Sequence, residues 1–589
     1  MRISNQSIRA AWLTARRAGL KRTFFRLQRR LRLKVINPLL AQQLYDKVSQ
    51  VDEALDAFSI NSEFHKRLAY MADMYQKGHA HNAWDVAQNK LTLLNQTSIE
   101  LDLPVSWFQN PIDDPLWLFH LHGWEWAWPI LTTSSNQRAG FSLWEDWLVQ
   151  VPIGKSIAWE PYPTSRRLVV WVATWQLLQG NQEFAAAIAQ HAHYLTDHLE
   201  RDLDNNHLVA NAKALVWAGL LLQSLPDAAL WLETGTHWLW YCVRTQVRAD
   251  GGHVENSTSY HMAVWLDVLS TVYLCQACDV TVPDDIYESV CRMGEFAWSL
   301  MLPNGRLPLL NDSIQDEPLP AAQIFDLADK VLASTAYRMK LDSPRQSKVF
   351  PDTGMVVFHL NNEQTYLLFD AGEIGPEHCP GHGHADTLSI ELWAYGQPLI
   401  VDPGTYQYPA GKWRDYFRST AVHSTATVDN LDQSEFAGPF RIGNMAHGHL
   451  NFYDLESINS RVSGAHDGYS RLSDPVLHQR EIVIKSAQEI VLVDRFLGKT
   501  QHSIALNFHL ATENTRVTTE TTIEAYYPED IQIQISVNSP ILGSFKKESG
   551  WLSSVWYKKV STSIVKFQAE VNLPETFETT IKISEKESL

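Results

Sequence analysis

The sequence predicts two unlike domains: an α/α toroid, which is an incomplete barrel of helical hairpins, followed by an antiparallel β-sandwich. With 589 residues the chain is too long for one hydrophobic core, so two or more domains are expected. Apolar residues recur at three- and four-residue spacing up to about residue 345, and short alternating segments replace them from about residue 347. We therefore predict a basic segment at 1–45, a helical domain at 46–345 and a sheet domain at 346–589, with the helix-to-sheet boundary between Ser334 and Val349.

The first 45 residues hold 11 Lys and Arg side chains and no Asp or Glu. Phe24, Leu27 and Leu31 are interspersed among them, a combination that is typical of a helix lying on an anionic membrane surface. Packing of the same basic helix against an acidic protein body fits the composition equally well, and an organelle transit peptide is a third interpretation. No signal peptide is recognised, because Arg and Lys interrupt the N-terminus throughout, and no apolar stretch approaches the ~18 residues that span a bilayer.

Helices are predicted along the N-terminal half from the spacing of its apolar residues. Short polar or glycine-containing breaks separate them, such as 202–205 and 250–252. Short connections make successive helices antiparallel, and a long run of helical hairpins is typical of a toroid or solenoid. The clearest predicted helices are 166–178, 183–199, 206–222, 228–247, 260–278 and 286–301.

Strands are predicted in the C-terminal half, where apolar and polar residues alternate over short segments between turn signals. A run of such segments without intervening helices is typical of an antiparallel sandwich. The clearest predicted strands are 354–360, 365–370, 387–394, 398–401, 481–484, 489–494, 503–510, 531–537 and 563–569.

The overall charge restricts the class of partner. The net charge is −17, and beyond residue 45 the chain carries −28. A body this acidic does not favour nucleic acid as a partner, and an anionic ligand would need a local basic lining. The 22 Trp residues mainly predict a tryptophan-rich core, although glycan-binding clefts also use aromatic rings as platforms. Five scattered cysteines argue against a disulfide framework, and Cys275 and Cys278 are interpreted as helix core.

Two helix starts carry polar side chains that we expect to meet. Asn206 and His207 open the helix at 206–222, and Tyr260 and His261 open the helix at 260–278. One helix lies between these two, so in an antiparallel array both run in the same direction and their N-termini face the same side. Helix N-termini favour a nearby carboxylate, which makes this convergence a candidate site. Simple N-capping is the alternative interpretation.

A third group of polar residues lies in the sheet domain. His382 and His384 are two residues apart, so on a strand they face the same way. Two imidazoles and a carboxylate suit Zn²⁺, although the spacing alone is also compatible with ordinary surface histidines.

Several long motifs in order along the chain resemble those of the heparinase II/III family of polysaccharide lyases. Such a resemblance implies a helical toroid and a β-sandwich, and cleavage of a uronate-containing acidic polysaccharide by β-elimination. The motifs are Trp159-Glu160-Pro161-Tyr162-Pro163-Thr164-Ser165-Arg166, Asn205-Asn206-His207, Ser259-Tyr260-His261, Leu307-Pro308-Leu309-Leu310-Asn311-Asp312, the stretch from Gly381 to Ser389, Val401-Asp402-Pro403-Gly404-Thr405-Tyr406, and Trp413 to Thr420 followed by His423-Ser424-Thr425.

The resemblance also implies roles for individual residues. Asn206 would neutralise the uronate carboxylate, Tyr260 would act as general acid and perform base chemistry as well, and His207 and His382 would complete the proton-transfer set. His384, Asp402 and His423 match structural zinc ligands. Further substrate contacts are expected from Arg166, His261, Arg414 and Arg418, and the basic lining from Arg166, Arg167, Lys213, Arg306 and Arg414.

The basic start resembles family members associated with capsule or exopolysaccharide synthesis, which implies a place in the bacterial cell envelope or on the cytoplasmic face of the membrane. Two other functions stay open at this point. One is a glycan-binding or scaffold protein without turnover, and the other is a hydrolase, either a glycosidase using Glu160 and Glu255 or a zinc enzyme. The sequence makes no prediction of the oligomeric state.

Overall fold

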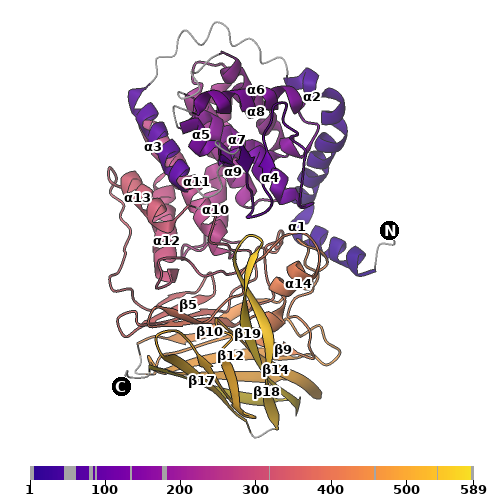
Figure 1. Ribbon diagram of the computed structural model, residues 1–589, viewed down its shortest axis with the longest axis vertical. Coiled ribbons are helices and arrows are strands. Elements are labelled where there is room, and N and C mark those ends of the chain that lie inside the picture. The colour runs from indigo at the N-terminus through magenta and orange to yellow at the C-terminus, as the bar shows by residue number, and fades with distance from the viewer. Residues whose placement is uncertain are drawn as a thin grey trace.

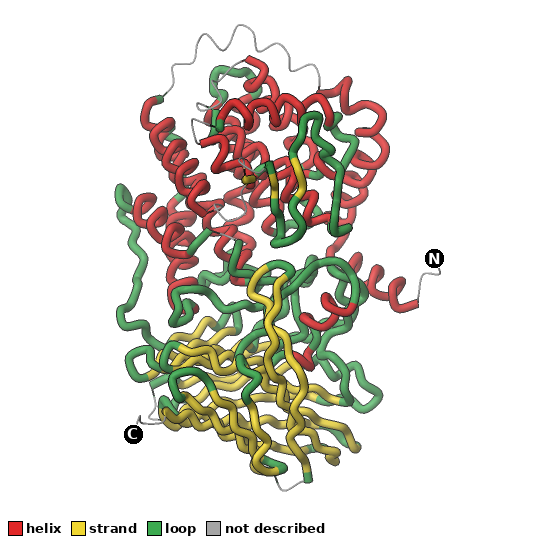
Figure 2. Tube along the Cα trace, viewed as in Figure 1, coloured by secondary structure: helices red, strands yellow, loops and turns green. Residues whose placement is uncertain are grey.

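A computed structural model describes residues 5–45, 61–78, 84–85, 89–132, 136–175, 182–317, 319–456, 459–539 and 542–585. Helices fill one half of the molecule and strands the other, as Figure 1 and Figure 2 show. The predicted fold class, a helical domain followed by an antiparallel sandwich, is confirmed.

Five of the six predicted helices are present within two residues of their expected bounds, while the first, predicted at 166–178, is a helix at Pro161–Ala173, and residues 176–178 lie outside the described residues. The helices before the sheet domain are α1 (Asn5–Leu31), α2 (Asn37–Tyr45), α3 (Ser62–Gly78), α4 (Pro115–Gly123), α5 (Trp128–Thr132), α6 (Gln137–Gln150), α7 (Pro161–Ala173), α8 (Gln182–His198), α9 (Asn206–Leu221), α10 (Ala228–Gln246), α11 (Thr258–Ala277), α12 (Asp284–Leu300) and α13 (Ala321–Leu332).

Helices α7, α9 and α11 form an inner layer, and α8, α10 and α12 lie outside them. α9 packs against α7, α8, α10 and α11, so nearly every side chain along it is buried. α11 is likewise apolar around most of its circumference, since α3, α9, α12 and α13 surround it. The two helices that carry candidate site residues are therefore fixed by packing on all sides.

Tryptophan supplies much of the helical core, as the sequence predicts. Twelve Trp side chains before residue 270 are fully buried, among them Trp171, which contacts both Trp124 and Trp147 edge to face. Cys275 is buried within the same core. Most of the aromatic content of this domain thus holds the helices together rather than facing solvent.

Two antiparallel sheets form the second domain, and α13 and β4 bracket the predicted boundary. One sheet has the strand order β10-β11-β12-β13-β20-β17-β16-β15, and the other β18-β19-β14-β8-β7-β6-β5-β4, with β9 paired to β14. The nine predicted strands are all present. The strands are β4 (Lys348–Phe350), β5 (Met355–Leu360), β6 (Thr365–Asp370), β7 (Ser389–Ala394), β8 (Gln397–Ile400), β9 (Ala426–Val428), β10 (Gly448–Asp454), β11 (Arg461–His466), β12 (Leu477–Ser486), β13 (Glu489–Leu497), β14 (Gln501–Leu510), β15 (Thr515–Thr519), β16 (Thr522–Tyr526), β17 (Ile531–Asn538), β18 (Gly543–Val555), β19 (Lys558–Asn572) and β20 (Glu575–Glu585), and a short helix α14 (Lys412–Arg418) lies between β8 and β9. Short strands β1 (Trp84–Asp85), β2 (Lys90–Leu91) and β3 (Ile99–Glu100) pair within the helical half.

Arg480 and Asp494 form a buried ion pair within the sandwich. Arg480 and Asp494 face each other across β12 and β13, both fully buried, with the Arg480 Nε donating to Asp494 Oδ1 at 2.8 Å. His478 donates from Nε2 to the same oxygen at 2.7 Å. Burial alone raises the pKa of Asp494, but Arg480 and His478 outweigh it and lower the pKa to about 2.

Replacement of Asp494 by Asn should lower the free energy of unfolding by about 3 kcal/mol at neutral pH, because the Arg480 charge stays buried without its partner. The carboxylate is less basic in the folded state than in the unfolded chain, whose Asp pKa is ~3.9, so its contribution is present above about pH 4 and is lost as the pH falls toward 2. Denaturant titrations should show the gap between the proteins closing over that range. Asp530→Asn, at an exposed turn, should match the parent at every pH.

One β-hairpin links the two domains. β18 and β19 extend beyond their sheet toward the helices, as Figure 1 shows. At the tip, Trp556 is buried in the helical core, and the Tyr557 hydroxyl donates to Asp114 Oδ2 at 2.6 Å. Asp114 is also the N-cap of α4, where its Oδ1 accepts the backbone N–H of Leu116. The tip is thus anchored both by apolar burial and by a charged hydrogen bond.

The basic N-terminal segment packs against the acidic body, as the second of its predicted placements requires. Gly19, with φ of 73°, interrupts α1. Before it, Arg17 donates to the carbonyl of Ile442 at 3.0 Å, and after it Arg22 pairs with Asp204 at 2.5 Å. Within the described residues, no helix is both long and apolar enough to cross a bilayer.

Candidate functional site

The N-termini of α9 and α11 meet, as the antiparallel arrangement predicts. Asn205 caps α9, and its side-chain oxygen accepts the backbone N–H of His207 at 3.1 Å. The Oε1 atom of Glu255, from the loop that precedes α11, accepts the backbone N–H of Asn206 at 3.0 Å. The Asn206 side chain is buried, and its Oδ1 has no hydrogen-bond partner within the described chain. The Asn206 Nδ2 likewise makes no hydrogen bond to the described residues, so its N–H groups can donate to a ligand.

His207 is held by a carboxylate and an aromatic ring. Its Nδ1 lies 3.1 Å from Glu200 Oε1, and its ring stacks on Tyr162 at a centroid distance of 4.2 Å. Arg29 of α1 approaches the same Glu200 oxygen at 3.4 Å. Donation from Nδ1 to Glu200 leaves the Nε2 lone pair of His207 as a proton acceptor.

Tyr260 and His382 are adjacent, although α11 carries one and a loop of the sheet domain the other. Their ring centroids lie 4.4 Å apart, and the Tyr260 hydroxyl is hydrogen-bonded to that of Tyr408 at 2.7 Å. Burial, followed by the proximity of Tyr408 and Asp312, raises the pKa of Tyr260 well above 10. The phenol therefore keeps its proton at neutral pH, which suits a general acid.

Asp312 connects the histidines of the sheet domain to the helical domain. It accepts His382 Nδ1 at 3.0 Å and His384 Nε2 at 3.1 Å, and Arg414 binds both of its oxygens. Burial alone would raise the pKa of Asp312, but Arg414 and the two histidines hold it well below its usual range. A permanent carboxylate thus orients both imidazoles. Donation from Nδ1 leaves the Nε2 of His382 as an acceptor, as in His207.

Glu255 occupies the space between the two halves of the site. Its Oε2 lies 3.8 Å from His382 Nε2, and burial raises its pKa. Glu160, its predicted partner in a hydrolase, instead lies 3.8 Å from Arg29. The two carboxylates thus belong to separate sets of contacts, which does not favour the hydrolase interpretation.

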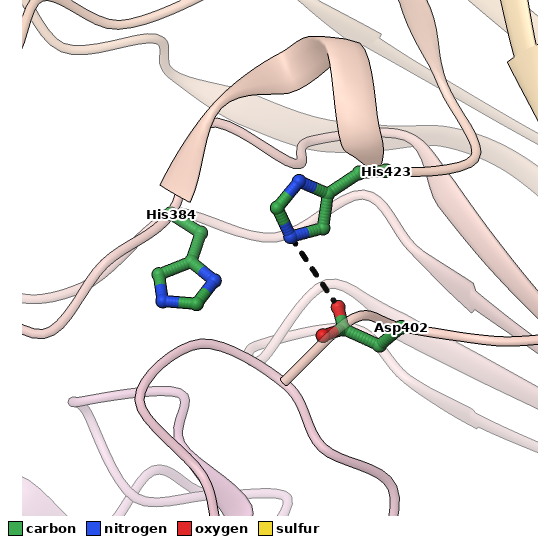
Figure 3. A group of neighbouring side chains, drawn as sticks. All are labelled: His384, Asp402 and His423. Atoms are coloured by element: carbon green, nitrogen blue, oxygen red, sulfur yellow. Dashed lines mark ion pairs between the residues drawn. The ribbon is translucent and has the colours of Figure 1, made fainter. Parts of the chain in front are cut away.

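The three predicted zinc ligands come together (Figure 3). Their ligand atoms all lie within 4.8 Å of one another, and His384, Asp402 and His423 are all buried. His423 Nδ1 donates to the Ser419 carbonyl and His384 Nε2 to Asp312, which leaves His423 Nε2 and His384 Nδ1 without hydrogen-bond partners in the described part of the chain, and His423 Nε2 lies 3.6 Å from Asp402 Oδ2. Two imidazole nitrogens that make no hydrogen bond, beside one carboxylate, are a donor set that Zn²⁺ accepts, and the hydrogen bonds of the other two nitrogens fix each ring.

The pKa shifts of these three residues also favour a bound cation. Burial raises the pKa of Asp402 well above its usual range, and burial lowers the pKa of His384 to about 4 and that of His423 well below 6.5. Neutral imidazoles keep their lone pairs for a cation, and a cation would compensate the buried carboxylate.

Two predicted substrate contacts are not at the site. His261 is buried in the helical core, where its Nε2 hydrogen-bonds the Met293 carbonyl at 3.0 Å. Successive residues on a helix point about 100° apart, so Tyr260 and its neighbour cannot both face the site. Arg418 is also buried, stacked 3.9 Å over Phe436 and donating to backbone carbonyls, so it holds a loop in place.

The residues of the predicted basic lining mostly contact protein groups. Four of its five cations are buried or half-buried and hydrogen-bonded to protein groups, so they stabilise the interior instead of presenting charge to a ligand. Arg306 is exposed and contacts Gln315. The four pairs are Arg166 with Glu125, Arg167 with His191, Lys213 with Asp267, and Arg414 with Asp312.

Sequence reasoning missed four residues that shape the site. Asp312 ends one of the family motifs and Glu255 lies in the polar loop before Tyr260, but neither position by itself indicates these contacts. Glu200 and Tyr408 gave no local signal, because each reaches the site only through the tertiary fold.

Comparisons with known proteins agree with this architecture. Residues 44–331 match the heparinase II/III N-terminus and residues 342–583 match the heparinase II/III-like C-terminal region. A heparin-sulfate lyase of Pedobacter heparinus is 23% identical over 504 residues, covering 79% of this chain and 73% of that protein. A heparin-sulfate lyase of Bacteroides stercoris is 22% identical over 534 residues, covering 81% and 76%.

Solved structures show the same fold. A crystal structure of heparinase III superimposes with a TM-score of 0.73 at 18% identity, covering 88% of this chain and 84% of the other. A heparan sulfate lyase from Pedobacter heparinus gives a TM-score of 0.64 at 19% identity, covering 92% and 91%. With both family regions matched in order over most of its length, the chain belongs to the heparinase II/III family.

Proposed function

We propose that this protein is a polysaccharide lyase that cleaves a uronate-containing acidic glycan by β-elimination. The observation that carries the proposal is the cluster of Asn206, His207, Tyr260 and His382, in which a carboxylate holds Nδ1 of each histidine and a neutral phenol lies beside one of them. The similarity to heparin-sulfate lyases supports the reaction class.

Asn206 would bind the uronate carboxylate. The C5 proton of a uronate becomes removable only when the negative charge that develops on the carboxylate is stabilised. The buried amide of Asn206, at the N-terminus of α9, can donate a hydrogen bond there, and the helix dipole adds to the effect.

Proton transfer falls to the remaining residues. A histidine Nε2, of His382 or His207, takes the C5 proton, the C4–C5 double bond forms, and the bond from C4 to the glycosidic oxygen breaks. Tyr260 gives its proton to the departing oxygen and regains one from the protonated histidine or from water. The products are an unsaturated uronate and a new sugar hydroxyl, and no water is added across the bond.

We also propose that His384, Asp402 and His423 hold a structural Zn²⁺. Bound there, the ion would supply positive charge that fixes the 384–423 region, and water could complete its coordination. His384 shares Asp312 with His382, so an ordered metal site would also steady the imidazole that faces Tyr260.

Weakly sulfated uronate polymers should be better substrates than densely sulfated ones. The cations that could have received sulfates are paired inside the protein, and the body carries a strong negative charge. We expect kcat/KM to be at least about tenfold higher on an unsulfated uronate polymer than on its heavily sulfated counterpart. Equal or reversed preference at matched ionic strength would contradict this.

An ultraviolet assay for the conjugated double bond tests the function itself. Purified protein is incubated with a panel of uronate polysaccharides, and new reducing ends are counted in parallel. A lyase gives both signals in equal amounts. New reducing ends without ultraviolet absorbance would instead indicate a hydrolase, and tight binding without either signal would indicate a glycan-binding or scaffold protein.

We further propose that the protein works in the cell envelope or on the cytoplasmic face of the membrane, in the processing of a capsular or exported polymer. The basic start of the chain, which resembles that of capsule-associated family members, supports this location.

A further inference from the structure

The N-terminal segment presents an unexpected face to solvent. Arg22, Arg26 and Arg29 of α1 point at Asp204, Asp202 and Glu200 of the body. Since these arginines occupy the inward face of α1, the apolar residues on its opposite face point to solvent. Leu20 is 92% exposed, Phe24 63% and Leu39 74%, and Leu27, Leu31, Val35, Leu40 and Leu44 are exposed as well.

These side chains form a continuous stripe. Leu20, Phe24, Leu27 and Leu31 recur at intervals of three and four residues, which places them on one face of α1. Among the described residues, eight of the 21 exposed large apolar side chains lie between positions 20 and 44. Scattered apolar residues need no explanation, but a stripe of this density marks an interaction surface. The helices that carry it, α1 and α2, lie along one edge of the molecule (Figure 1).

The charges that flank the stripe identify its partner. Lys21, Arg30 and Lys34 are exposed beside it, and residues 1–45 contain no acid. Apolar side chains flanked by cations suit the headgroup boundary of an anionic bilayer, where the chains enter the acyl region and the ammonium groups meet phosphates. A second copy of this chain fits less well, because a twofold contact would bring like charges together.

We propose that the outer face of α1 and α2 is a membrane-docking surface for anionic lipid, with Phe24, Leu27 and Leu31 at its centre. This gives the proposed location at the membrane a physical basis and does not depend on the lyase activity. The arginines on the opposite face of α1, among them Arg29, pair with the body beside Glu200, the carboxylate that holds His207. Docking would therefore bring the site close to the bilayer and to polymer that emerges from it.

Vesicle flotation tests the surface with the full-length protein. One set of vesicles contains phosphatidylcholine alone, and the other contains phosphatidylcholine mixed with phosphatidylglycerol. The parent protein should float with the mixed vesicles and much less with the neutral ones. The triple variant Phe24→Gln/Leu27→Gln/Leu31→Gln should lose at least tenfold in partition coefficient, because the exposed substitutions remove the apolar contact without touching the inner arginines.

The control replaces the same number of exposed apolar residues elsewhere, as Leu103→Gln/Val149→Gln/Leu230→Gln, and should bind like the parent. Circular dichroism and polymer cleavage should be unchanged in both variants. The proposal is overturned if the parent does not float with anionic vesicles, or if both triple variants lose binding equally. It is also overturned if the parent sediments as an oligomer that only the Phe24/Leu27/Leu31 variant dissociates, which would assign the stripe to self-association. A failed flotation leaves the ultraviolet assay unaffected, so the two proposals fail independently.

Discussion

Replacement of Tyr260 by Phe should lower kcat on the best uronate polymer by about 10³-fold while KM changes little. The variant removes one hydroxyl, which is the only group of Tyr260 that can protonate the leaving oxygen, and loss of a general acid costs roughly 10²–10⁴-fold. The ring and its contact with His382 remain, so the fold should be preserved. The measurement is the initial rate of double-bond formation at saturating substrate.

Two comparison variants separate chemistry from structure. Tyr453→Phe, at an exposed position of the sheet domain, should retain full activity. Tyr408→Phe removes the hydrogen-bond partner of the Tyr260 hydroxyl and should give a smaller loss, because the acid itself remains. Full activity of Tyr260→Phe would rule out Tyr260 as the proton donor.

Removal of metal should lower the melting temperature of the parent protein by about 10 °C. An ion at a thousandfold its dissociation constant stabilises the folded state by about 4 kcal/mol, and each kcal/mol moves the melting temperature of a domain of this size by about 2–4 °C. Asp402→Asn and His423→Ala should lack the metal and melt at the same temperature with and without chelator. Differential scanning calorimetry, with metal analysis of each purified protein, measures both quantities.

His447→Ala serves as the control for this experiment, since it removes a solvent-accessible histidine of the same domain and should leave the chelator response intact. If the parent contains no metal as purified, takes up none from added Zn²⁺, and melts unchanged with chelator, the zinc proposal is wrong. A chelator effect on rate without any effect on melting would place the metal at the reaction centre instead.

The sequence predicts the fold well because its signals are local. Helices such as 206–222 and 260–278 have regular apolar spacing and recognisable caps, and both begin within two residues of the predicted positions. The convergence of Asn206 with Tyr260 also followed from the direction of successive helices. These inferences needed no knowledge of which side chains touch.

Side-chain partners were harder to predict. Lys213 was expected to face a substrate, yet its partner Asp267 lies 54 residues away on another helix. Arg414 meets Asp312 from 102 residues away. The sequence does not show whether a basic side chain will pair with a buried carboxylate. Charge patterning therefore predicts the sign of a charge but not whether that charge is accessible to a ligand. The orientation of helix α1 likewise depends on acidic residues far away in the sequence, since its Arg29 pairs with Asp202.

The β18–β19 hairpin bears on how a polymer reaches the site. Its tip keeps Trp556 within the helical core while its strands belong to the sheet. Separating the domains would expose that indole, at a free-energy cost of about 3 kcal/mol or more. A conformer with the domains apart would therefore make up less than about one molecule in a hundred. The two domains should therefore keep a fixed arrangement during catalysis. Glycan would slide into the site lengthwise from the side, and a bulky branch near the scissile bond would block entry rather than be accommodated by a hinge.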